Sequence, residues 1–433
     1  MTHTARAAPP AHTPVAVVGG GQAGLAMSHQ LRERAIPHVV FERERIAHTW
    51  RDQRWDSFSL VTPNWQCRLP GHPYAGPDPH GFMGRDAVVA YIEDYARRVE
   101  PPLREGVSVT AVRPTGGGFR LATSEGEVAA DAVVMATSAY HVPAIPAAAA
   151  ALPDDVVQIH SSAYRRPGQL PAGAVLVVGS GQSGCQIAED LHLAGRAVHL
   201  VVGSAPRAPR VYRGRDGVDW LDAMGQYDLT VADHPLGEGV RRNANHYLTG
   251  RDGGRDIDLR RFAREGMRLY GRLRGVEGAC LHLADDLAQN LDRADAVYTG
   301  IQGAIDRYIA AAGIEAPAGD HYVPVWQPGA GVPSLDLRAA GIGGVVWATG
   351  FRSDFGYVEA PVFDDAGRPR HARGVTDTPG LYFVGLPWLW TWGSGRFSGI
   401  ARDTEYVAER VAERMAERIA ERPQGGDARI RAT

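Results

Sequence analysis

Two segments far apart in the chain share one pattern of apolar and small residues. Each begins with a run rich in valine, continues through a glycine-rich turn, and enters a helix that starts with small residues; the copies cover residues 15–26 and 175–187. Helical spacing and a second apolar run follow each copy, at 38–41 and 197–202. Strand, helix and strand in this order are typical of a βαβ unit with parallel strands. The pattern predicts an α/β fold containing two such units.

The other periodic segments predict a meander and two long helices. Alternating runs at 107–112, 118–122 and 128–136 predict three strands. Residues 286–310 place apolar side chains three or four positions apart, which predicts an amphipathic helix packed on its domain. From Gly399 another long helix carries an apolar stripe. That stripe suits docking on a sheet or on another subunit, so a homodimer stays one of two alternatives.

The length of the chain limits the number of domains, and two segments of it follow no periodic pattern. The chain has 433 residues, enough for two or three domains. Residues 218–260 follow no clear period. The opening residues 1–13 lack the apolar stretch of a signal peptide and are expected to form a disordered tail. No apolar run approaches the roughly 20 residues that span a bilayer, so no membrane partner is expected.

Composition excludes several classes of site. The formal net charge of -3 gives no basic surface for nucleic acid. All 46 Lys and Arg residues are arginines, which excludes a Walker-type phosphate loop, a Schiff-base lysine and a pyridoxal phosphate site. Cys67, Cys185 and Cys280 are far apart and form no CxxC pair. A disulfide framework, a dithiol redox centre and a cysteine zinc site are excluded, and a cytoplasmic location with no bound metal is expected.

The two glycine-rich turns both have the spacing GxGxxG. In such a turn the first glycine permits the tight bend, the second lets the backbone approach a pyrophosphate, and the third lets helix pack on strand. The helix N-terminus then faces the phosphates. The glycines are Gly19, Gly21 and Gly24 in the first turn and Gly179, Gly181 and Gly184 in the second. Two turns, each between a strand and a helix, imply two bound dinucleotides.

The residues after the second strand of each unit distinguish the two nucleotides. Glu42 lies 18 residues after Gly24, where a carboxylate accepts hydrogen bonds from a ribose diol and repels a 2′-phosphate. The first site therefore suits FAD or NAD. Ser204 and Arg207 lie 20 and 23 residues after Gly184, and a guanidinium suits the 2′-phosphate of NADPH. Alternatively, Arg207 lies in a solvated basic loop and binds no phosphate. This alternative is stronger for the later arginines Arg210, Arg213 and Arg215.

The order of motifs resembles that of the class B flavoprotein monooxygenases over residues 14–400. This family includes the flavin-containing monooxygenases, the YUCCA enzymes and, more distantly, the Baeyer–Villiger monooxygenases. Beyond the two turns, the resemblance rests on segments 49–64, 136–146, 160–165, 347–351 and 380–385. It implies two Rossmann-like domains of the glutathione-reductase type: an FAD domain of residues 14–165 and 345–433, and an inserted NADPH domain of residues 166–344.

The resemblance also implies which residues contact the cofactors FAD and NADPH. These are Gly19, Gly21, Gln22, Ala23, Gly24, Glu42, Arg43, Trp50, Arg51, Thr62, Asn64, Ala136, Thr137, Gly179, Gly181, Gln182, Ser183, Gly184, Ser204, Arg207, Ala348, Thr349, Gly350 and Gly385. Either Thr62 or Asn64 could occupy the family's flavin-facing position, because Pro63 shifts the register, and Asn64 is favoured.

The chain departs from the family pattern at three further positions. Asp154 and Val156 stand where the family fingerprint has Phe and Gly before His160, and Ser138 replaces the glycine of an Ala-Thr-Gly segment. His160 itself is expected at the crossing between the domains, either as a structural or as a mechanistic residue. These departures leave the subclass within the family open.

The implied reaction passes electrons from NADPH through FAD to an acceptor. Since no cysteine pair is available, the default acceptor is O2, which reduced flavin captures as a C4a-(hydro)peroxide that oxygenates a small nitrogen or sulfur substrate. Baeyer–Villiger oxygenation of a ketone is one alternative, and a non-catalytic redox sensor is another. The catalytic candidates are Asn64, through its amide, and Arg396, as partner of a substrate carboxylate. The substrate wall is expected to contain Trp65, Trp388, Trp390 and Trp392, for which core packing is the competing interpretation.

Overall fold

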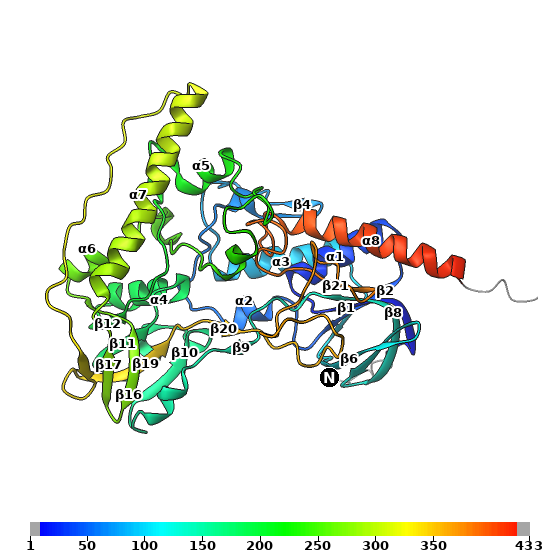
Figure 1. Ribbon diagram of the computed structural model, residues 1–433, viewed down its shortest axis with the longest axis horizontal. Coiled ribbons are helices and arrows are strands. Elements are labelled where there is room, and N and C mark those ends of the chain that lie inside the picture. The colour runs from blue at the N-terminus through cyan, green and yellow to red at the C-terminus, as the bar shows by residue number, and fades with distance from the viewer. Residues whose placement is uncertain (1–8, 422–433) are drawn as a thin grey trace, which may run out of the picture.

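The computed structural model describes residues 9–421, which form two lobes (Figure 1). The sheet of the first lobe is mixed and that of the second lobe is parallel. In the first lobe the strand order is β5-β2-β1-β8-β7-β6, with β21 also paired to β8. The strands are β1 His12–Val18, β2 His38–Glu42, β5 Leu103–Glu105, β6 Val109–Thr115, β7 Gly118–Thr123, β8 Gly126–Met135 and β21 Leu381–Phe383. Strands β6, β7 and the first half of β8 form the predicted meander.

The second lobe carries a five-stranded parallel sheet in the order β10-β19-β11-β12-β15. Its strands are β10 Val157–His160, β11 Ala174–Val178, β12 Val198–Val201, β15 Arg268–Tyr270 and β19 Ile342–Trp347. A three-stranded antiparallel sheet lies beside it, made of β16 Leu273–Glu277, β17 Cys280–Leu283 and β18 Ser334–Asp336. Three short pairs complete the strands: β3 Arg68–Leu69 with β4 His72–Pro73, β13 Val211–Tyr212 with β14 Arg215–Asp216, and β9 Val142–Pro143 with β20 Phe351–Arg352.

The helices cover the two sheets and join the lobes. They are α1 Gln22–Glu33, α2 His48–Asp52, α3 Arg85–Val99, α4 Gln182–Leu193, α5 Gly217–Ala223, α6 Leu259–Arg264, α7 Leu287–Ala312 and α8 Ile400–Glu421. The helices predicted at 286–310 and from Gly399 are confirmed as α7 and α8. The unassigned stretch 218–260 consists mainly of turns around α5 and the start of α6.

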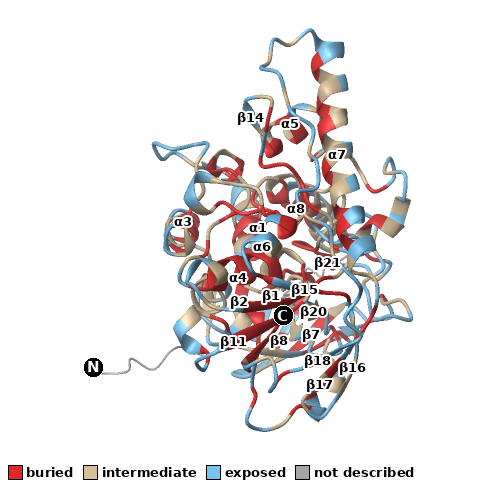
Figure 2. Ribbon diagram, turned by 90° about the vertical axis from the view of Figure 1, so that its left-hand side faces the viewer, coloured by how far each residue is buried: buried red, intermediate tan, exposed pale blue. Residues whose placement is uncertain are grey.

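Burial explains the valine runs. All five residues of β11 are buried, as are five of the seven in β1, because helices or other strands cover both faces of each parallel sheet (Figure 2). Strands buried on both sides have continuous apolar runs rather than alternation. The meander alternates instead: β7 and the first half of β8 place every second residue in the interior.

The sheets correct the expected boundaries. Strands β10 and β19 both belong to the second sheet, so that sheet begins at Val157 and ends at Trp347 rather than at 166 and 344. Strand β1 starts at His12, so residues 12 and 13 of the expected tail 1–13 belong to the first sheet. Of the expected tail, residues 1–8 lie outside the described part of the chain.

The long C-terminal helix packs within the chain. Helix α8 runs along α1 (Figure 1), and Val407, Ala408 and Val411 on it are fully buried in the same core cluster as Leu25 of α1. Of the two docking alternatives, the intramolecular one is the one seen. Between residues 9 and 421, no helix is long and apolar enough to cross a bilayer.

Candidate functional site

The two glycine-rich turns have nearly the same backbone. Gly19 has φ +108° and Gly179 has φ +107°, values that L side chains rarely adopt. A Cβ on Gly19 would lie 2.7 Å from the carbonyl oxygen of Ala136, and one on Gly179 would lie 2.5 Å from that of Ala348. The first glycine of each turn is therefore required for two reasons. Its φ is positive, and the backbone of Ala136 or Ala348 lies too close for a side chain.

The third glycine of each turn allows helix to pack on strand. A Cβ on Gly24 would lie 1.8 Å from the carbonyl oxygen of Gly19, and one on Gly184 would lie 1.9 Å from that of Gly179. These distances are far below any van der Waals contact. The first and third positions are thus fixed by the protein itself, whether or not a ligand is bound.

The middle glycine differs, because it faces open space. A Cβ on Gly21 or on Gly181 would meet nothing within 4 Å. Each of the two glycines caps the N-terminus of a helix, α1 or α4, and neither helix has a side chain that bonds its free N–H groups. Open space in front of an uncapped helix N-terminus fits a pyrophosphate. Both turns therefore fit a dinucleotide, and we call them the first and second cradles.

The first cradle ends in an acid, as predicted. The carboxylate of Glu42, at the end of β2, accepts hydrogen bonds from Gly20 N at 2.7 Å and from Glu44 N at 2.9 Å. These bonds hold the carboxylate beside the turn, where a ribose diol would lie. The next residue, Arg43, is exposed.

The first cradle is tied to the loop at 385–399. Gln22 Nε2 donates to the carbonyl oxygen of Gly395 at 2.8 Å. Gly385 has φ +77°, and a Cβ there would lie 2.6 Å from the Cβ of Ala23. Trp50 stacks on Phe397 of the same loop, with ring centroids 5.7 Å apart. Gln22, Ala23 and Trp50 therefore all lie against the loop that begins at Gly385.

Arg51 is already engaged by a protein acid. Its guanidinium pairs with Glu93 of α3, so the two elements α2 and α3 are joined at the edge of the first lobe. Thr62, the alternative to Asn64 at the flavin-facing position, is half-buried.

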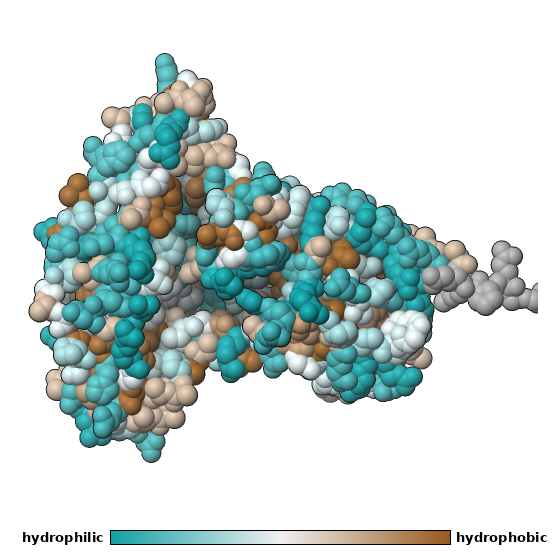
Figure 3. Space-filling model, in the orientation of Figure 1, coloured by the Kyte–Doolittle hydropathy of each residue, from teal (hydrophilic) through white to brown (hydrophobic). Residues whose placement is uncertain are grey.

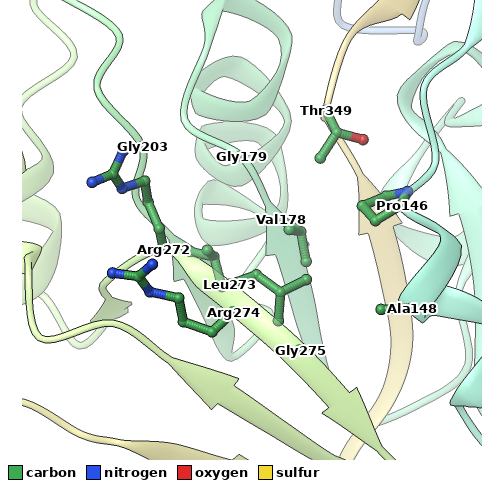
Figure 4. Close-up of a pocket in the computed structure, with 11 residues that line it drawn as sticks. Pro146, Ala148, Val178, Gly179, Gly203, Arg272, Leu273, Arg274, Gly275 and Thr349 are labelled. Atoms are coloured by element: carbon green, nitrogen blue, oxygen red, sulfur yellow. The ribbon is translucent and has the colours of Figure 1, made fainter.

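The second cradle lacks an acid at its strand end. Gly203, two residues after β12, donates its N–H to Ser180 Oγ at 2.9 Å, and Ser204 is exposed. Gln182 Nε2 donates to the carbonyl oxygen of Leu248 at 2.5 Å, and Ser183 follows in the first turn of α4. A pocket of roughly 310 Å³ opens beside Gly179 (Figure 4).

Arg207 does not lie in that pocket. Its side chain is 2 % exposed, pairs with Asp295 of α7 at 2.7 Å, and lies between the rings of Tyr298 and Tyr322, whose centroids are 4.2 and 3.9 Å from the guanidinium carbon. Both expectations for Arg207, a phosphate ligand and a solvated loop residue, disagree with this placement. Sequence spacing alone could not show that an acid of a helix about ninety residues later binds it.

The next arginine is buried for a similar reason. Arg210 donates to the carbonyl oxygen of Val61 and to Asp216, both at 2.7 Å, and its guanidinium lies over the ring of Phe82. It therefore joins the second lobe to the segment 61–82 of the first. Arg213 pairs with Asp306, and only Arg215 of this series is an exposed side chain without an acidic partner within the described residues.

Asn64 is placed differently from the prediction. Its side chain is buried, its Nδ2 donates to the carbonyl oxygen of Asp78 at 2.9 Å, and its Oδ1 accepts from Met83 N at 2.7 Å. Both ends of the amide are thus used to close the loop 78–83. This geometry gives Asn64 a structural role in the loop, and it commits the Oδ1 acceptor and one of the two N–H donors of its amide.

Two of the three tryptophans in the loop 385–399 form one aromatic stack. Trp392 stacks on Tyr227 with centroids 4.7 Å apart and an interplanar angle of 7°, and Trp388 stacks on Trp392 with centroids 6.4 Å apart. Trp65 and Leu248 belong to the same apolar cluster. This cluster lies between the two lobes. It adjoins the second cradle, because Gln182 of that cradle donates a hydrogen bond to Leu248 of the cluster.

Trp390 points elsewhere. Its ring lies against the guanidinium groups of Arg373 and Arg402, 3.5 and 4.8 Å from the centroid. Tryptophans at alternate positions share one side only in an extended segment, but Trp388 has φ +52° and the segment is a series of turns. Trp390 is therefore removed from the substrate wall.

Arg396 lies at the edge of the aromatic stack. Its guanidinium donates to Asn245 Oδ1 at 2.6 Å and lies 5.1 Å from the centroid of Trp392. His246 packs edge-on against Trp392, and burial, followed by the charge of Arg396, lowers the pKa of His246 to about 4, so the imidazole is neutral. Tyr227, Asn245 and His246 were missed because they lie in the stretch without a periodic pattern.

The crossing between the lobes is held by His160. Its Nδ1 accepts from Ser162 N at 3.2 Å, and its Nε2 lies 2.9 Å from the carbonyl oxygen of Gly350. Both ring nitrogens are engaged with the protein, and burial lowers the pKa of the imidazole below its usual value. Of the two roles considered for His160, the geometry supports the structural one.

The two crossing segments differ at one position. In the second lobe Ala348 and Thr349 are followed by Gly350 with φ +81°, while in the first Ala136 and Thr137 are followed by Ser138 with φ +64°. Ser138 therefore adopts the left-handed conformation that the family's glycine would adopt.

The cysteines are not arranged for redox chemistry. Cys67 and Cys185 are buried and Cys280 is half-buried, and none of the three is in a disulfide. Burial raises the pKa of Cys67 to about 12, so its thiol stays protonated. Within residues 9–421 no cluster of His, Cys, Asp and Glu could hold a metal ion.

Comparisons with known proteins agree with this geometry. A sequence model of the pyridine nucleotide-disulphide oxidoreductase family matches residues 16–219. The chain is 32 % identical over 397 residues to an uncharacterized CzcO-like oxidoreductase of Geobacillus kaustophilus, covering 91 % of this chain and 96 % of that protein.

Solved structures show the same fold. A flavin-containing monooxygenase from Stenotrophomonas maltophilia superposes with a TM-score of 0.63 at 19 % identity, over 93 % of this chain and 99 % of that one. An ornithine N-hydroxylase from Kutzneria sp. 744 superposes with a TM-score of 0.59 at 20 % identity, over 93 % of this chain and 100 % of that one. The chain is therefore an oxidoreductase of the CzcO-like family, with the fold and motif order of the class B flavoprotein monooxygenases.

Proposed function

We propose that the chain is a monooxygenase that uses FAD in the first cradle and NADPH in the second to oxygenate a small nitrogen or sulfur compound. One observation carries this proposal: two cradles with the same backbone, each with an open middle glycine, end differently, with Glu42 in the first and no acid in the second. The acid suits the ribose of FAD, and its absence leaves room for a 2′-phosphate.

The residues of each cradle would hold the cofactors through the backbone. Gly21 and Gly181 leave space for the pyrophosphates, and the N-termini of α1 and α4 supply the N–H donors. FAD, once bound, supplies the redox chemistry with NADPH and O2. The work left for this chain is to position the two nucleotides, to admit the substrate and to exclude water.

The aromatic cluster is suited to exclude water from the space between the lobes. Trp392, Tyr227 and Trp388 stack there, with Trp65 in the same cluster. The loop that carries the tryptophans is bonded to the first cradle through Gln22, and Leu248 of the cluster is bonded to the second cradle through Gln182. A substrate bound against this cluster would lie between both cradles.

The buried cysteines favour O2 as electron acceptor over a disulfide exchange. No cysteine pair exists to pass electrons onward, and the Cys67 thiol is kept protonated by burial. Arg396 remains the candidate partner of a substrate carboxylate, since it is half-exposed at the edge of the cluster and bonded to the neutral Asn245 rather than to an acid.

The test is product mass. The FAD-loaded protein should be incubated with NADPH, ¹⁸O₂ and a panel of amines, sulfides and ketones. A product that is heavier by one ¹⁸O atom on nitrogen or sulfur supports the proposal. A lactone or ester from a ketone would assign Baeyer–Villiger oxygenation instead. NADPH oxidation that no substrate accelerates would indicate a redox sensor.

A further inference from the structure

The pocket beside Gly179 lies at the carboxyl edge of the second sheet, where a nucleotide crosses such a fold. On one side it is lined by Pro146 and Thr349, and on the other by Gly203 and by the start of β16 (Figure 4). We call it the β16 pocket. Gly179 opens the second cradle and Gly203 follows β12, so the pocket spans the place where the adenosine half of a dinucleotide would lie.

Two arginines at the start of β16 line this pocket. Arg272 and Arg274 are two positions apart, and Figure 4 shows both side chains extending to the side where Gly203 lies. Both are exposed, and no acidic side chain is among the lining residues. The pocket is therefore electropositive at the end where the ribose of the adenosine half is expected.

Arg272 is held in a fixed position. Asp286, which precedes α7, accepts from the backbone N of Arg272 at 2.9 Å and from its Nε at 2.5 Å. One edge of the guanidinium is thus used by the protein, and its terminal nitrogens are left for a ligand. Because Asp286 partly neutralises Arg272, the free positive charge of the pocket comes mainly from Arg274.

Arg274 has no partner within the protein. No hydrogen bond, ion pair or ring contact engages its side chain anywhere in residues 9–421. The residue lies at an irregularity of the β16–β17 pairing, where Leu273 opposes Leu283 but Gly275 opposes His282, so one extra residue is inserted on β16. Bulges of this kind redirect a side chain and are frequent next to functional sites.

We infer that Arg274, supported by Arg272, binds the 2′-phosphate of NADPH in the β16 pocket. This inference rests on the proposed function, because it names the residues by which the second cradle selects NADPH over NADH. A guanidinium recognises a phosphate dianion through charge-assisted, often bidentate hydrogen bonds. The role first expected of Arg207 passes to a strand that starts more than sixty residues later, since the Arg207 guanidinium is committed to Asp295.

The test is a binding titration that does not require turnover. The FAD-loaded protein is titrated calorimetrically with 2′,5′-ADP and with 5′-AMP, which differ only in the phosphate on the 2′ position. Arg274→Ala should reduce the preference for 2′,5′-ADP about tenfold and change the affinity for 5′-AMP less than about twofold. Arg274→Lys keeps the charge and should recover part of the preference.

A matched control is Arg120→Ala, which removes an exposed arginine of β7 paired with Glu127 on the meander. It changes the net charge equally and should leave both affinities as they are. An unchanged 2′-phosphate preference in Arg274→Ala would overturn the inference and leave the proposed function standing. A wild-type protein that binds both ligands equally would also overturn it, while failure of the wild type to bind either ligand would overturn the second cradle itself.

Discussion

The two cradles have almost the same backbone but different surroundings. Both have a positive φ at the first glycine, a third glycine against the carbonyl of the first, and a middle glycine facing open space. They differ in the side chains beyond the turn: Glu42 is bonded to its own turn, whereas exposed Ser204 and the pair Arg272 and Arg274 lie near the second. On the face that Figure 3 shows, hydrophilic side chains cover much of both lobes. Under the proposed function, the shared backbone would make each turn a dinucleotide site, and a few side chains outside the turn would select the dinucleotide that binds.

The largest expected effect comes from filling the open space of one cradle at a time. Gly21→Ala should reduce FAD affinity at least a thousandfold, about 4 kcal/mol, because the methyl group occupies the position of the pyrophosphate. Gly181→Ala should leave the protein yellow and abolish nicotinamide binding. Flavin absorbance of the purified variants and calorimetric titration with NADPH measure the two effects.

Both variants should fold normally, since neither methyl group meets an atom within 4 Å. Gly24→Ala is the contrasting control, because its Cβ would collide with the carbonyl oxygen of Gly19 and should prevent folding of the turn. Loss of flavin from both Gly21→Ala and Gly181→Ala would show that the two cradles are not independent.

The next effect separates Arg207 from the second cradle. Arg207→Ala leaves Asp295 and the rings of Tyr298 and Tyr322 around a vacated buried site, which should cost about 3 kcal/mol of unfolding free energy. The ratio of NADPH to NADH affinity should stay the same. Urea denaturation gives the first quantity and titration the second; a selective loss of NADPH with unchanged stability would return Arg207 to the phosphate site.

A third prediction concerns the helix behind the first cradle. Asp403, in the first turn of α8, is fully buried, and desolvation raises its pKa to about 6 despite hydrogen bonding to Ser394 and the charges of Arg402 and Arg373. In the unfolded chain this carboxyl loses its proton near pH 4. Between these values the folded state holds the extra proton, so stability falls as pH rises from about 4 to 6 and stays lower above that.

The corresponding variant is Asp403→Asn, which cannot ionise. It should be more stable than the wild type by about 3 kcal/mol at pH 8 and equally stable at pH 4. Urea midpoints measured at several pH values give the comparison. Parallel stability curves for the two proteins would exclude Asp403 as the titrating group.

A fourth prediction concerns the acid of the first cradle. Glu42→Ala removes the carboxylate expected to bind the ribose of FAD and should weaken FAD binding about tenfold, about 1.4 kcal/mol. NADPH affinity should not change, because the second cradle has no counterpart. Flavin retention on dilution measures the first effect. An equal loss of affinity for FAD and NADPH would indicate that Glu42 acts on the contact between the two lobes and not on the ribose of FAD.

The smallest expected effect concerns the segments 136–138 and 348–350, which differ in having Ser138 in one and Gly350 in the other. Ser138→Gly relieves a serine at φ +64° and should raise the unfolding free energy by less than about 1 kcal/mol. The reverse exchange, Gly350→Ser, should lower it by about 1 kcal/mol, and thermal denaturation measures both. If Ser138→Gly destabilises the protein instead, the serine side chain has a role that its φ does not reveal.

Sequence patterns predicted the elements of this fold well, because local physics determines them. The valine runs of β1 and β11, the glycines of both turns and the stripes of α7 and α8 are each encoded within a few consecutive residues. The lobe boundaries were less well predicted, since membership of β10 in the second sheet depends on pairing with β19, more than 180 residues away.

The side chains of the site were predicted less well, for the same reason. Asn64 and Arg207 have the residue types that the chemistry needs, yet each is committed to partners distant in sequence: the loop 78–83 in one case and Asp295 in the other. Conversely, Arg274 lies on a strand with no motif, and only the fold brings it to the second cradle.

In the proposed function the two cradles hold different nucleotides at once and electrons pass between them. Anaerobic addition of one equivalent of NADPH to the FAD-loaded protein tests this transfer. We expect complete bleaching of the flavin absorbance, slower with NADH, and recovery of the colour when O2 is admitted. A protein that takes up no flavin, or a bound flavin that NADPH leaves oxidised, would contradict the proposed function.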